Sequence, residues 1–250
     1  MLHIPPLPGA PRYAGNLEPI RRRVLDDATA LVEGGVDGLL LENFGDTPFY
    51  PERVPPQAVA CMTRLGQEVG QRCDVPLGVN VLRNDGRSAL AVAHAIGAAF
   101  IRVNVLCGVR LTDQGLIQGI AHQLLRQRVQ LGASDIRILA DVNVKHSAPL
   151  GPARSVRQEV VDLVERGGAD AVIVSGEGTG APADPAELAQ VKQAAGETPV
   201  LVGSGVTAET IRALLTHADG AIVGTSLKVD DVTVNPVDPK RVQTLIAAAR

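Results

Sequence analysis

The sequence predicts an α/β fold in which residues 1–250 form one (β/α)₈ barrel, or TIM barrel, as a single domain. Eight short β-rich segments alternate with eight segments that are compatible with helices. The strand candidates are apolar along most of their length, as in parallel strands covered on both faces. The length of 250 residues also matches a complete barrel of this class.

The elements are expected in strict alternation along the chain. Strands are predicted at 2–6, 36–43, 76–82, 100–106, 137–144, 170–176, 199–205 and 220–227. Helices are predicted at 17–33, 55–71, 86–97, 115–131, 155–166, 184–195, 207–217 and 238–249. Asp184 before Pro185 is a typical helix start, and Gly34-Gly35 stands where a helix ends. A doubly wound open sheet would need a glycine-rich turn after the first strand, and the sequence has no such turn there.

Charge and cysteine content narrow the range of partners. A net charge of −3 and the absence of a long basic run argue against a nucleic-acid partner. Cys61, Cys73 and Cys107 lack the spacing of a thiolate metal site or a disulfide framework. No segment approaches the roughly 18 apolar residues of a membrane span. We therefore expect a cytoplasmic protein without an integral membrane segment.

The fifth strand carries the clearest polar pattern. Alternation with a period of two places Asp141, Asn143 and Lys145 on one face, with valines between them. This face is predicted to point into the barrel at the carboxyl ends of the strands, where barrels of this class hold their active sites. Lys145 is a candidate anion ligand, general acid or, when desolvated, Schiff-base nucleophile.

Neighbouring strands contribute further polar residues by the same alternation. The candidate catalytic residues are Glu42, Asp141, Asn143, Lys145 and His146, and the candidate substrate-binding residues are His3, Asn80, Asn104, Ser175 and Thr179. One alternative is that Arg102, Asp141 and Glu42 neutralise one another as a buried structural network. Another is a divalent metal held by carboxylate and amide oxygens, although the sequence requires no cofactor.

Two glycine-containing segments predict a phosphate site. One ends the seventh strand and opens a helix, and the other ends the eighth strand. Glycine lets backbone N–H groups approach an anion, and a helix N-terminus adds a favourable partial charge. The loops after strands seven and eight are the usual phosphate site of this fold. The expected phosphate-binding residues are Gly203, Ser204, Gly205, Gly224, Thr225 and Ser226.

At these residues the chain resembles the BtpA/SgcQ family. The resemblance is carried by HIPPLPGAPRY (3–13), GGVDGLLLENFGDTPF (34–49), DVNVKHSAPL (141–150), VSGEGTG (174–180), VGSGVT (202–207) and VGTSLK (223–228). It covers essentially the whole chain and implies a barrel of the ribulose-phosphate-binding type. The family takes its name from a photosystem I biogenesis factor, and other members are associated with sugar or nucleoside metabolism.

Two classes of function follow from the residues and the resemblance. The favoured one is an enzyme that binds a phosphorylated sugar or nucleotide-like small molecule, with isomerase, lyase or aldolase, and nucleosidase-like hydrolase chemistry all open. The alternative is a non-catalytic photosystem I biogenesis or stability factor. A homo-oligomer is compatible with either class.

Overall fold

A computed structural model describes residues 1–152, 154–176, 178 and 181–250. Within these residues, parallel strands form one sheet in the order β1-β2-β3-β4-β7-β9-β10-β11. These strands are β1 (Leu2–His3), β2 (Leu39–Glu42), β3 (Leu77–Asn80), β4 (Phe100–Val103), β7 (Arg137–Val142), β9 (Ala171–Val174), β10 (Val200–Val202) and β11 (Gly220–Ala221). Met1 N donates to Val223 O at 2.8 Å, which joins the first strand to the segment after the last one. The predicted TIM barrel is confirmed.

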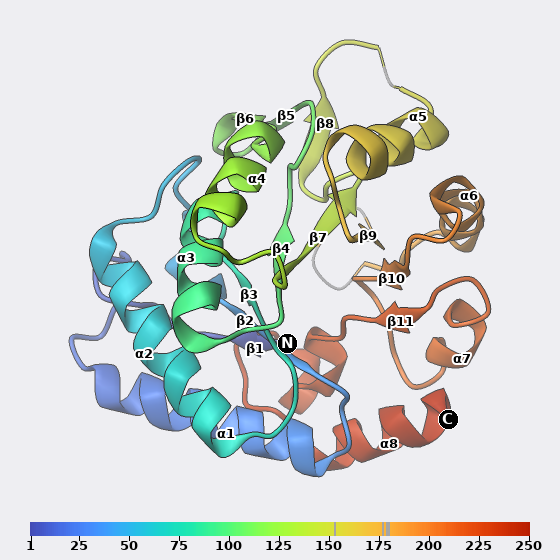
Figure 1. Cartoon of the computed structure of the whole chain (residues 1–250). Coiled ribbons are helices and arrows are strands. Elements are labelled where there is room, and N and C mark those ends of the chain that lie inside the picture. The colour runs from blue at the N-terminus through green and yellow to red at the C-terminus, as the bar shows by residue number, and fades with distance from the viewer. Residues whose placement is uncertain (153, 177, 179–180) are drawn as a thin grey trace.

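Helices surround the strands on the outside (Figure 1). They are α1 (Leu17–Glu33), α2 (Pro56–Arg72), α3 (Gly86–Ile96), α4 (Ala121–Gln130), α5 (Val156–Val161), α6 (Pro185–Ala195), α7 (Ile211–Leu214) and α8 (Pro239–Ala249). A π-helical turn, Asp162–Arg166, extends α5. Asn16, Asp85 and Asp184 cap α1, α3 and α6 by accepting a backbone N–H in the first turn. Local sequence therefore sets several of these helix starts.

The strand register places the polar residues in one layer. His3 is the partner of Glu42, Glu42 of Asn80, and Asn80 of Arg102. Their chain neighbours Leu41, Val79 and Ile101 are fully buried and pack toward the helices. Because successive side chains in a strand point to opposite faces, these polar residues point into the barrel.

The predicted helix at 115–131 is wrong at its beginning. Strands β5 (Val109–Thr112) and β6 (Gly115–Gln118) form an antiparallel hairpin, and β8 (Ser147–Pro149) pairs with β5 to make a small second sheet. Thr112 pairs with Gly115, so the hairpin has a two-residue turn, and Gly115 has a φ of 93° that favours glycine. Helix α4 begins only at Ala121.

Several other elements are shorter than the sequence predicts, among them β1, β11, α7 and β7. Helix α7 is only four residues long, Ile211–Leu214, instead of the predicted 207–217. Strand β7 ends at Val142, and Asn143 has a φ of 49°, so the extended backbone stops before Lys145. No helix in the described part of the chain is long and apolar enough to cross a membrane.

Candidate functional site

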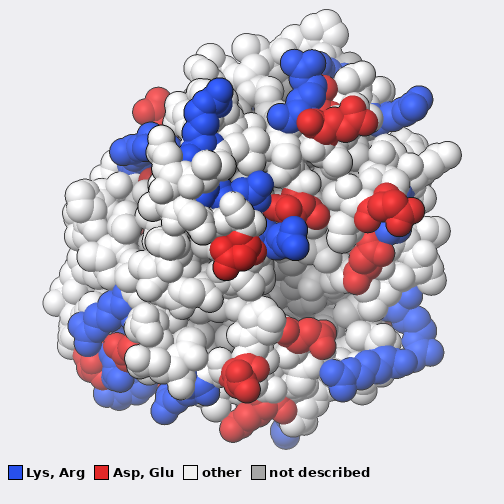
Figure 2. Space-filling view, viewed as in Figure 1, with Lys and Arg blue, Asp and Glu red and all other residues white. Residues whose placement is uncertain are grey.

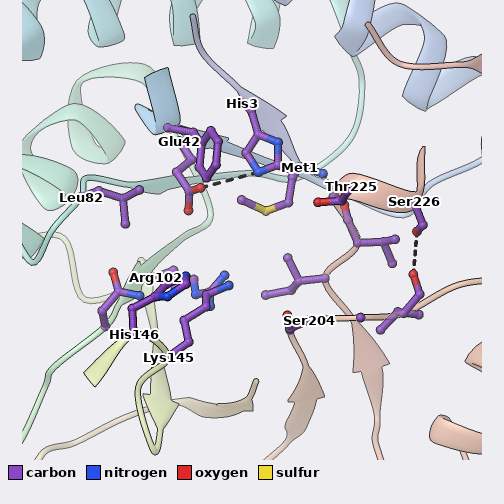
Figure 3. Close-up of a pocket in the computed structure, with 18 of the residues that line it drawn as sticks. Met1, His3, Glu42, Leu82, Arg102, Lys145, His146, Ser204, Thr225 and Ser226 are labelled. Atoms are coloured by element: carbon purple, nitrogen blue, oxygen red, sulfur yellow. Dashed lines mark hydrogen bonds and ion pairs between the residues drawn. The ribbon is translucent and has the colours of Figure 1, made fainter. Parts of the chain in front are cut away.

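A cavity of about 740 Å³ lies at the carboxyl ends of the strands. Figure 2 shows basic and acidic side chains side by side near the middle of one face, without a large area of one charge. In Figure 3, Glu42 and His3 lie on one side of the cavity, and Arg102 and Lys145 lie on the facing side. The cavity is also lined by Arg83, Asn104, Asp113, His146 and the two glycine-containing loops at 203–207 and 224–226.

A buried ion pair forms the floor beneath this cavity. Arg102 donates from Nε to Asp141 Oδ1 at 2.9 Å and from Nη2 to Asp141 Oδ2 at 3.0 Å. Asn104 Nδ2 donates to the same carboxylate at 2.8 Å, so all three side chains are fixed. The Asp141 side chain is 0% exposed and does not line the cavity. Asp141 therefore positions Arg102 and Asn104, which do line it.

Two more predicted residues support this floor from behind. Asn80 Nδ2 donates to Arg102 O at 3.0 Å, and its buried Oδ1 has no partner among the described residues. The Ser175 hydroxyl accepts from Arg102 Nη2 at 3.5 Å, a weak contact. Both residues are buried, and neither lines the cavity. The structure thus places Asn80 and Ser175 behind the cavity wall.

Glu42 and His3 form a buried pair on the facing wall. His3 Nε2 lies 3.7 Å from Glu42 Oε1, and the two side chains are 9% and 8% exposed. The Glu42 side chain makes no hydrogen bond within the described residues. Burial raises the pKa of Glu42, although Arg102 and Lys145 oppose this effect. Burial, together with nearby cations, lowers the pKa of His3 well below its ordinary range. Burial therefore disfavours the charged form of both side chains.

Lys145 reaches the cavity from the loop after β7. Its ammonium makes no hydrogen bond or ion pair in the described part of the chain, whereas its carbonyl accepts from Arg83 Nη2 at 2.5 Å. Burial lowers the pKa of Lys145, and the charge of Arg102 adds to this effect. His146 also lines the cavity, and partial burial lowers its pKa. The loop therefore presents one amine and one imidazole.

The loops after β10 and β11 line the same cavity and contain backbone N–H groups without an acceptor. Among the described residues, the N–H groups of Ser204, Gly205, Val206 and Gly224 have no hydrogen-bond acceptor. Ser204 and Val206 are buried, and buried backbone N–H groups are nearly always paired in folded proteins. All four residues line the cavity. The arrangement suits an acceptor with several oxygen atoms.

The hydroxyl groups of these loops are already used to hold the loops. Ser204 Oγ donates to Gly178 O at 3.1 Å, and Ser226 Oγ donates to Val206 O at 2.6 Å. Thr225 Oγ1 lies 2.9 Å from Thr233 Oγ1. Gly205 has a φ of +63°, and a Cβ there would lie 2.2 Å from Pro182 Cα. The loop shape therefore depends on these contacts, while the backbone N–H groups remain available.

Two of the predictions about the site residues are wrong. Asn143 does not share the inward face with Asp141, because the strand has ended and the backbone has turned. Its amide donates to Glu187 Oε1 at 3.2 Å and accepts from Arg110 Nη1 at 3.3 Å, outside the cavity. The glycine segment 203–205 does not open directly into a helix, since α7 begins at Ile211. Thr179 lies outside the described residues.

Three charged residues that line the cavity, Arg83, Asp113 and Asp231, were not predicted from the sequence. Arg83 follows β3 by three positions and is 5% exposed, and Asp113 occupies the turn of the β5–β6 hairpin. The position of Arg83, soon after a strand end, was a usable signal. Asp113 reaches the cavity only because the hairpin folds over it. No group of three His, Cys, Asp or Glu side chains in the described residues has a geometry that would hold a metal ion.

One protein family matches this chain along its full length. The model of the BtpA family matches residues 1–250. This chain belongs to the BtpA family. It is 48% identical over 248 residues to "Photosystem I biogenesis protein BtpA" of Synechocystis sp., a match that covers 99% of this chain and 86% of that protein.

Other relatives are spread widely among organisms. An uncharacterized protein of Thermococcus kodakarensis is 44% identical over 250 residues, which cover 100% of this chain and 94% of that protein. An uncharacterized mitochondrial protein of Caenorhabditis elegans is 33% identical over 247 residues, covering 97% of this chain and 88% of that protein. Chains similar to this one along most of its length therefore occur in Synechocystis sp., Thermococcus kodakarensis and Caenorhabditis elegans.

Solved structures agree on the fold at low sequence identity. N-(5'-phosphoribosyl)anthranilate isomerase from Pyrococcus furiosus has a TM-score of 0.58 and 14% identity, covering 90% of this chain and 93% of that one. A structure described as native KDPGal also has a TM-score of 0.58 and 14% identity, covering 90% of this chain and 86% of that one. These similarities support the barrel assignment for the BtpA-family chain.

Proposed function

We propose that this BtpA-family protein is an enzyme that acts on a phosphorylated sugar or nucleotide-like small molecule. One observation carries the proposal. Unpaired backbone N–H groups of two adjacent loops and a set of buried acid–base side chains line the same cavity. Such a cavity can bind the phosphate group of a ligand and bring reactive side chains to the rest of the same ligand. We call the phosphate-binding part, formed by the N–H groups of Ser204, Gly205, Val206 and Gly224, the phosphate seat.

The backbone donors are assigned to the phosphate. Ser204, Gly205, Val206 and Gly224 supply N–H groups that have no other acceptor in the described residues. Donors that are already fixed in place cost little further ordering when an anion binds. Anchoring the phosphate would hold the rest of the ligand against Glu42 and Lys145, and such positioning is a large part of catalysis.

The opposite wall is assigned to proton transfer. A buried carboxyl group with a raised pKa keeps its proton to a higher pH than an exposed one, and a general acid must hold a proton before it can give it. Glu42 has that environment, and the guanidinium groups of Arg83 and Arg102 place positive charge at the same cavity. Isomerisation, lyase or aldolase chemistry and glycosidic-bond cleavage are all compatible with this set of groups.

The size of the cavity favours a metabolite over a macromolecule. Its volume of about 740 Å³ lies within the range of roughly 300–1,000 Å³ found for small-molecule sites. The name of one relative by fold, N-(5'-phosphoribosyl)anthranilate isomerase, is in line with a phosphorylated ligand.

A second candidate comes from the name of the Synechocystis relative. A non-catalytic role in photosystem I biogenesis would not need Glu42 or Lys145 as reactive groups. Variants at these two positions separate the two candidates, because an enzyme loses turnover while an assembly factor keeps its effect on photosystem I.

Calorimetric titration with inorganic phosphate tests the first step of the proposal. We expect saturable binding and a melting temperature that rises with phosphate concentration, because a ligand of the folded state stabilises it by RT ln(1 + [L]/Kd). A panel of phosphorylated sugars and nucleotides then identifies ligands that bind more tightly than phosphate alone. If neither phosphate nor any panel member binds or raises the melting temperature, the enzyme proposal is wrong.

A further inference from the structure

Lysine is rare in this chain. Lys and Arg together number 24, and the lysines are Lys145, Lys192, Lys228 and Lys240. Arginine stays charged at any pH the protein meets, whereas a desolvated lysine can lose its proton and act as a nucleophile. A lysine inside a cavity of such an arginine-rich chain therefore points to chemistry that arginine cannot perform.

The other lysines have different surroundings. Lys192 Nζ lies 2.8 Å and 2.6 Å from the two carboxylate oxygens of Asp219. Lys228 is fully buried and donates to Asp27 Oδ2 at 2.9 Å. Lys240 is exposed in the first turn of α8. In the described residues, Lys145 is the lysine that is largely buried, lines the cavity and has an ammonium without a hydrogen bond or ion pair.

The neighbours of Lys145 oppose a further positive charge. Arg83 is held beside it by the bond to the Lys145 carbonyl. Arg102 faces the same cavity, and its charge, with burial, lowers the pKa of Lys145. Asp141 and Glu42 act in the opposite direction, but both oxygens of Asp141 already accept bonds from Arg102. The geometry thus combines burial, two guanidinium groups and no dedicated counter-ion.

We propose that Lys145 forms a Schiff base with the carbonyl carbon of a phosphorylated aldehyde or ketone bound in this cavity. The inference rests on the proposed function, because the phosphate seat would bring the carbonyl group to the amine. Glu42, on the facing wall, is the acid that completes the reaction (Figure 3).

The bond changes balance without a co-reactant. The neutral amine of Lys145 adds its lone pair to the carbonyl carbon, and one proton moves from nitrogen to the former carbonyl oxygen to give a carbinolamine. Protonated Glu42 then gives its proton to the hydroxyl group, which leaves as water while the nitrogen lone pair forms the C=N bond. The products are an iminium cation, water and the Glu42 carboxylate. The cation withdraws electrons from the adjacent carbon, as isomerase and aldolase chemistry require.

Pyridoxal 5′-phosphate is a suitable probe, because it carries both an aldehyde and a phosphate. The full chain is incubated with the probe at pH 7, reduced with borohydride, digested and mapped by mass spectrometry. We expect Lys145 to be labelled at least several-fold faster than Lys240, because Lys145 is largely buried beside Arg83 and Arg102 and burial favours the neutral amine, whereas Lys240 is exposed. Inorganic phosphate is expected to slow labelling at Lys145 and not at Lys240.

Two matched variants complete the test. Lys145→Arg keeps the positive charge and removes the nucleophile, so it is expected to bind phosphate, to melt near the wild-type temperature and to lose the label in the cavity. Lys240→Arg is expected to leave labelling of Lys145 unchanged. Lys145 labelling no faster than that of Lys240, in protein that binds phosphate, refutes the Schiff base and leaves the proposed function standing. Rapid labelling of Lys145 that phosphate does not slow retains the nucleophile and refutes the phosphate seat.

Discussion

The guanidinium group of Arg102 and the carboxylate of Asp141 form a two-point ion pair at the floor of the cavity. The two hydrogen bonds measure 2.9 Å and 3.0 Å, and the two side chains are 3% and 0% exposed. Of the pair, Arg102 lines the cavity and Asp141 does not. Asp141 thus fixes the position of the Arg102 guanidinium group at the cavity and compensates the charge of that group.

Asp141→Asn is expected to destabilise the protein strongly. Removing one partner of a buried ion pair leaves the other charge uncompensated, which typically costs about 3–5 kcal/mol. For a chain of this size each kcal/mol lowers the melting temperature by about 2–4 °C. Calorimetric melting of the variant measures the loss. Asp135→Asn, which changes an exposed carboxylate, is the matched control and is expected to melt like the wild type.

A double variant checks that charge compensation is the cause. Arg102→Met with Asp141→Leu removes both charges, so it is expected to be more stable than either single variant. A double variant whose loss equals the sum of the single losses would show that the two side chains act independently.

Glu42→Gln is expected to stabilise the folded chain at neutral pH and to abolish turnover. Because burial raises the pKa of Glu42 above 4.5, the folded state binds the proton more tightly than the unfolded state does. The resulting stability is fully present below pH 4.5 and is lost as the pH rises through the folded-state pKa. Glutamine does not ionise and avoids this loss.

Urea titrations of wild type and Glu42→Gln between pH 4 and pH 8 measure the effect. The variant's advantage is expected at pH 7 and is expected to vanish toward pH 4. Glu52→Gln, at an exposed loop position, serves as the control. An advantage that stays constant across this range would mean that Glu42 does not carry a raised pKa.

His3 is expected to have the opposite pH dependence. Burial lowers its pKa well below 6.5, so the stability that neutral His3 contributes is present above pH 6.5 and is lost as the pH falls. Its ring packs against Phe44 with the ring centres 4.7 Å apart, so any replacement also loses packing. The informative quantity is therefore the slope of unfolding free energy against pH, between pH 7 and pH 5.

His3→Gln is expected to reduce that slope relative to wild type. His94→Gln, at an exposed position of α3, is expected to leave the slope unchanged. Equal slopes for wild type and His3→Gln would show that His3 is not held neutral by its surroundings.

The sequence predicts the barrel because parallel strands covered by helices give an apolar pattern that few other folds share. It also predicts the inward direction of Glu42 and Arg102, since alternation within a strand is strict. It fails at Asn143, because a strand's last residue depends on neighbours such as Glu187 and Glu159, which bond to Asn143 from distant helices.

The residues that line the cavity could be predicted only in part. Strand alternation cannot show that Asp141 is covered by Arg102, because that depends on which of two neighbouring inward side chains lies closer to the opening. It also cannot place Asp113, which reaches the cavity through the pairing of β5 with β6 and β8. Loop residues become predictable only when the pairing of their flanking strands is known.

Gly224→Ala is the sharpest test of the phosphate seat. A Cβ at this position would lie 2.9 Å from His3 Cε1, and the buried His3 ring has little room to move. The loop is therefore expected to shift and to misplace the Gly224 N–H. Losing one hydrogen bond to a charged group costs about 1.5–3 kcal/mol. This corresponds to roughly 10–150-fold weaker phosphate binding.

Calorimetric titration with phosphate measures this change, and Gly70→Ala is the matched control. Gly70 lies in α2, where a Cβ meets nothing within 4 Å, so the control is expected to bind phosphate normally and to melt no lower than wild type. Gly205→Ala is a poorer choice, because a Cβ there would meet Pro182 and the loss of binding could reflect a damaged fold. Phosphate affinity that is the same in Gly224→Ala, Gly70→Ala and wild type would place the anion elsewhere in the cavity, against the loop assignment.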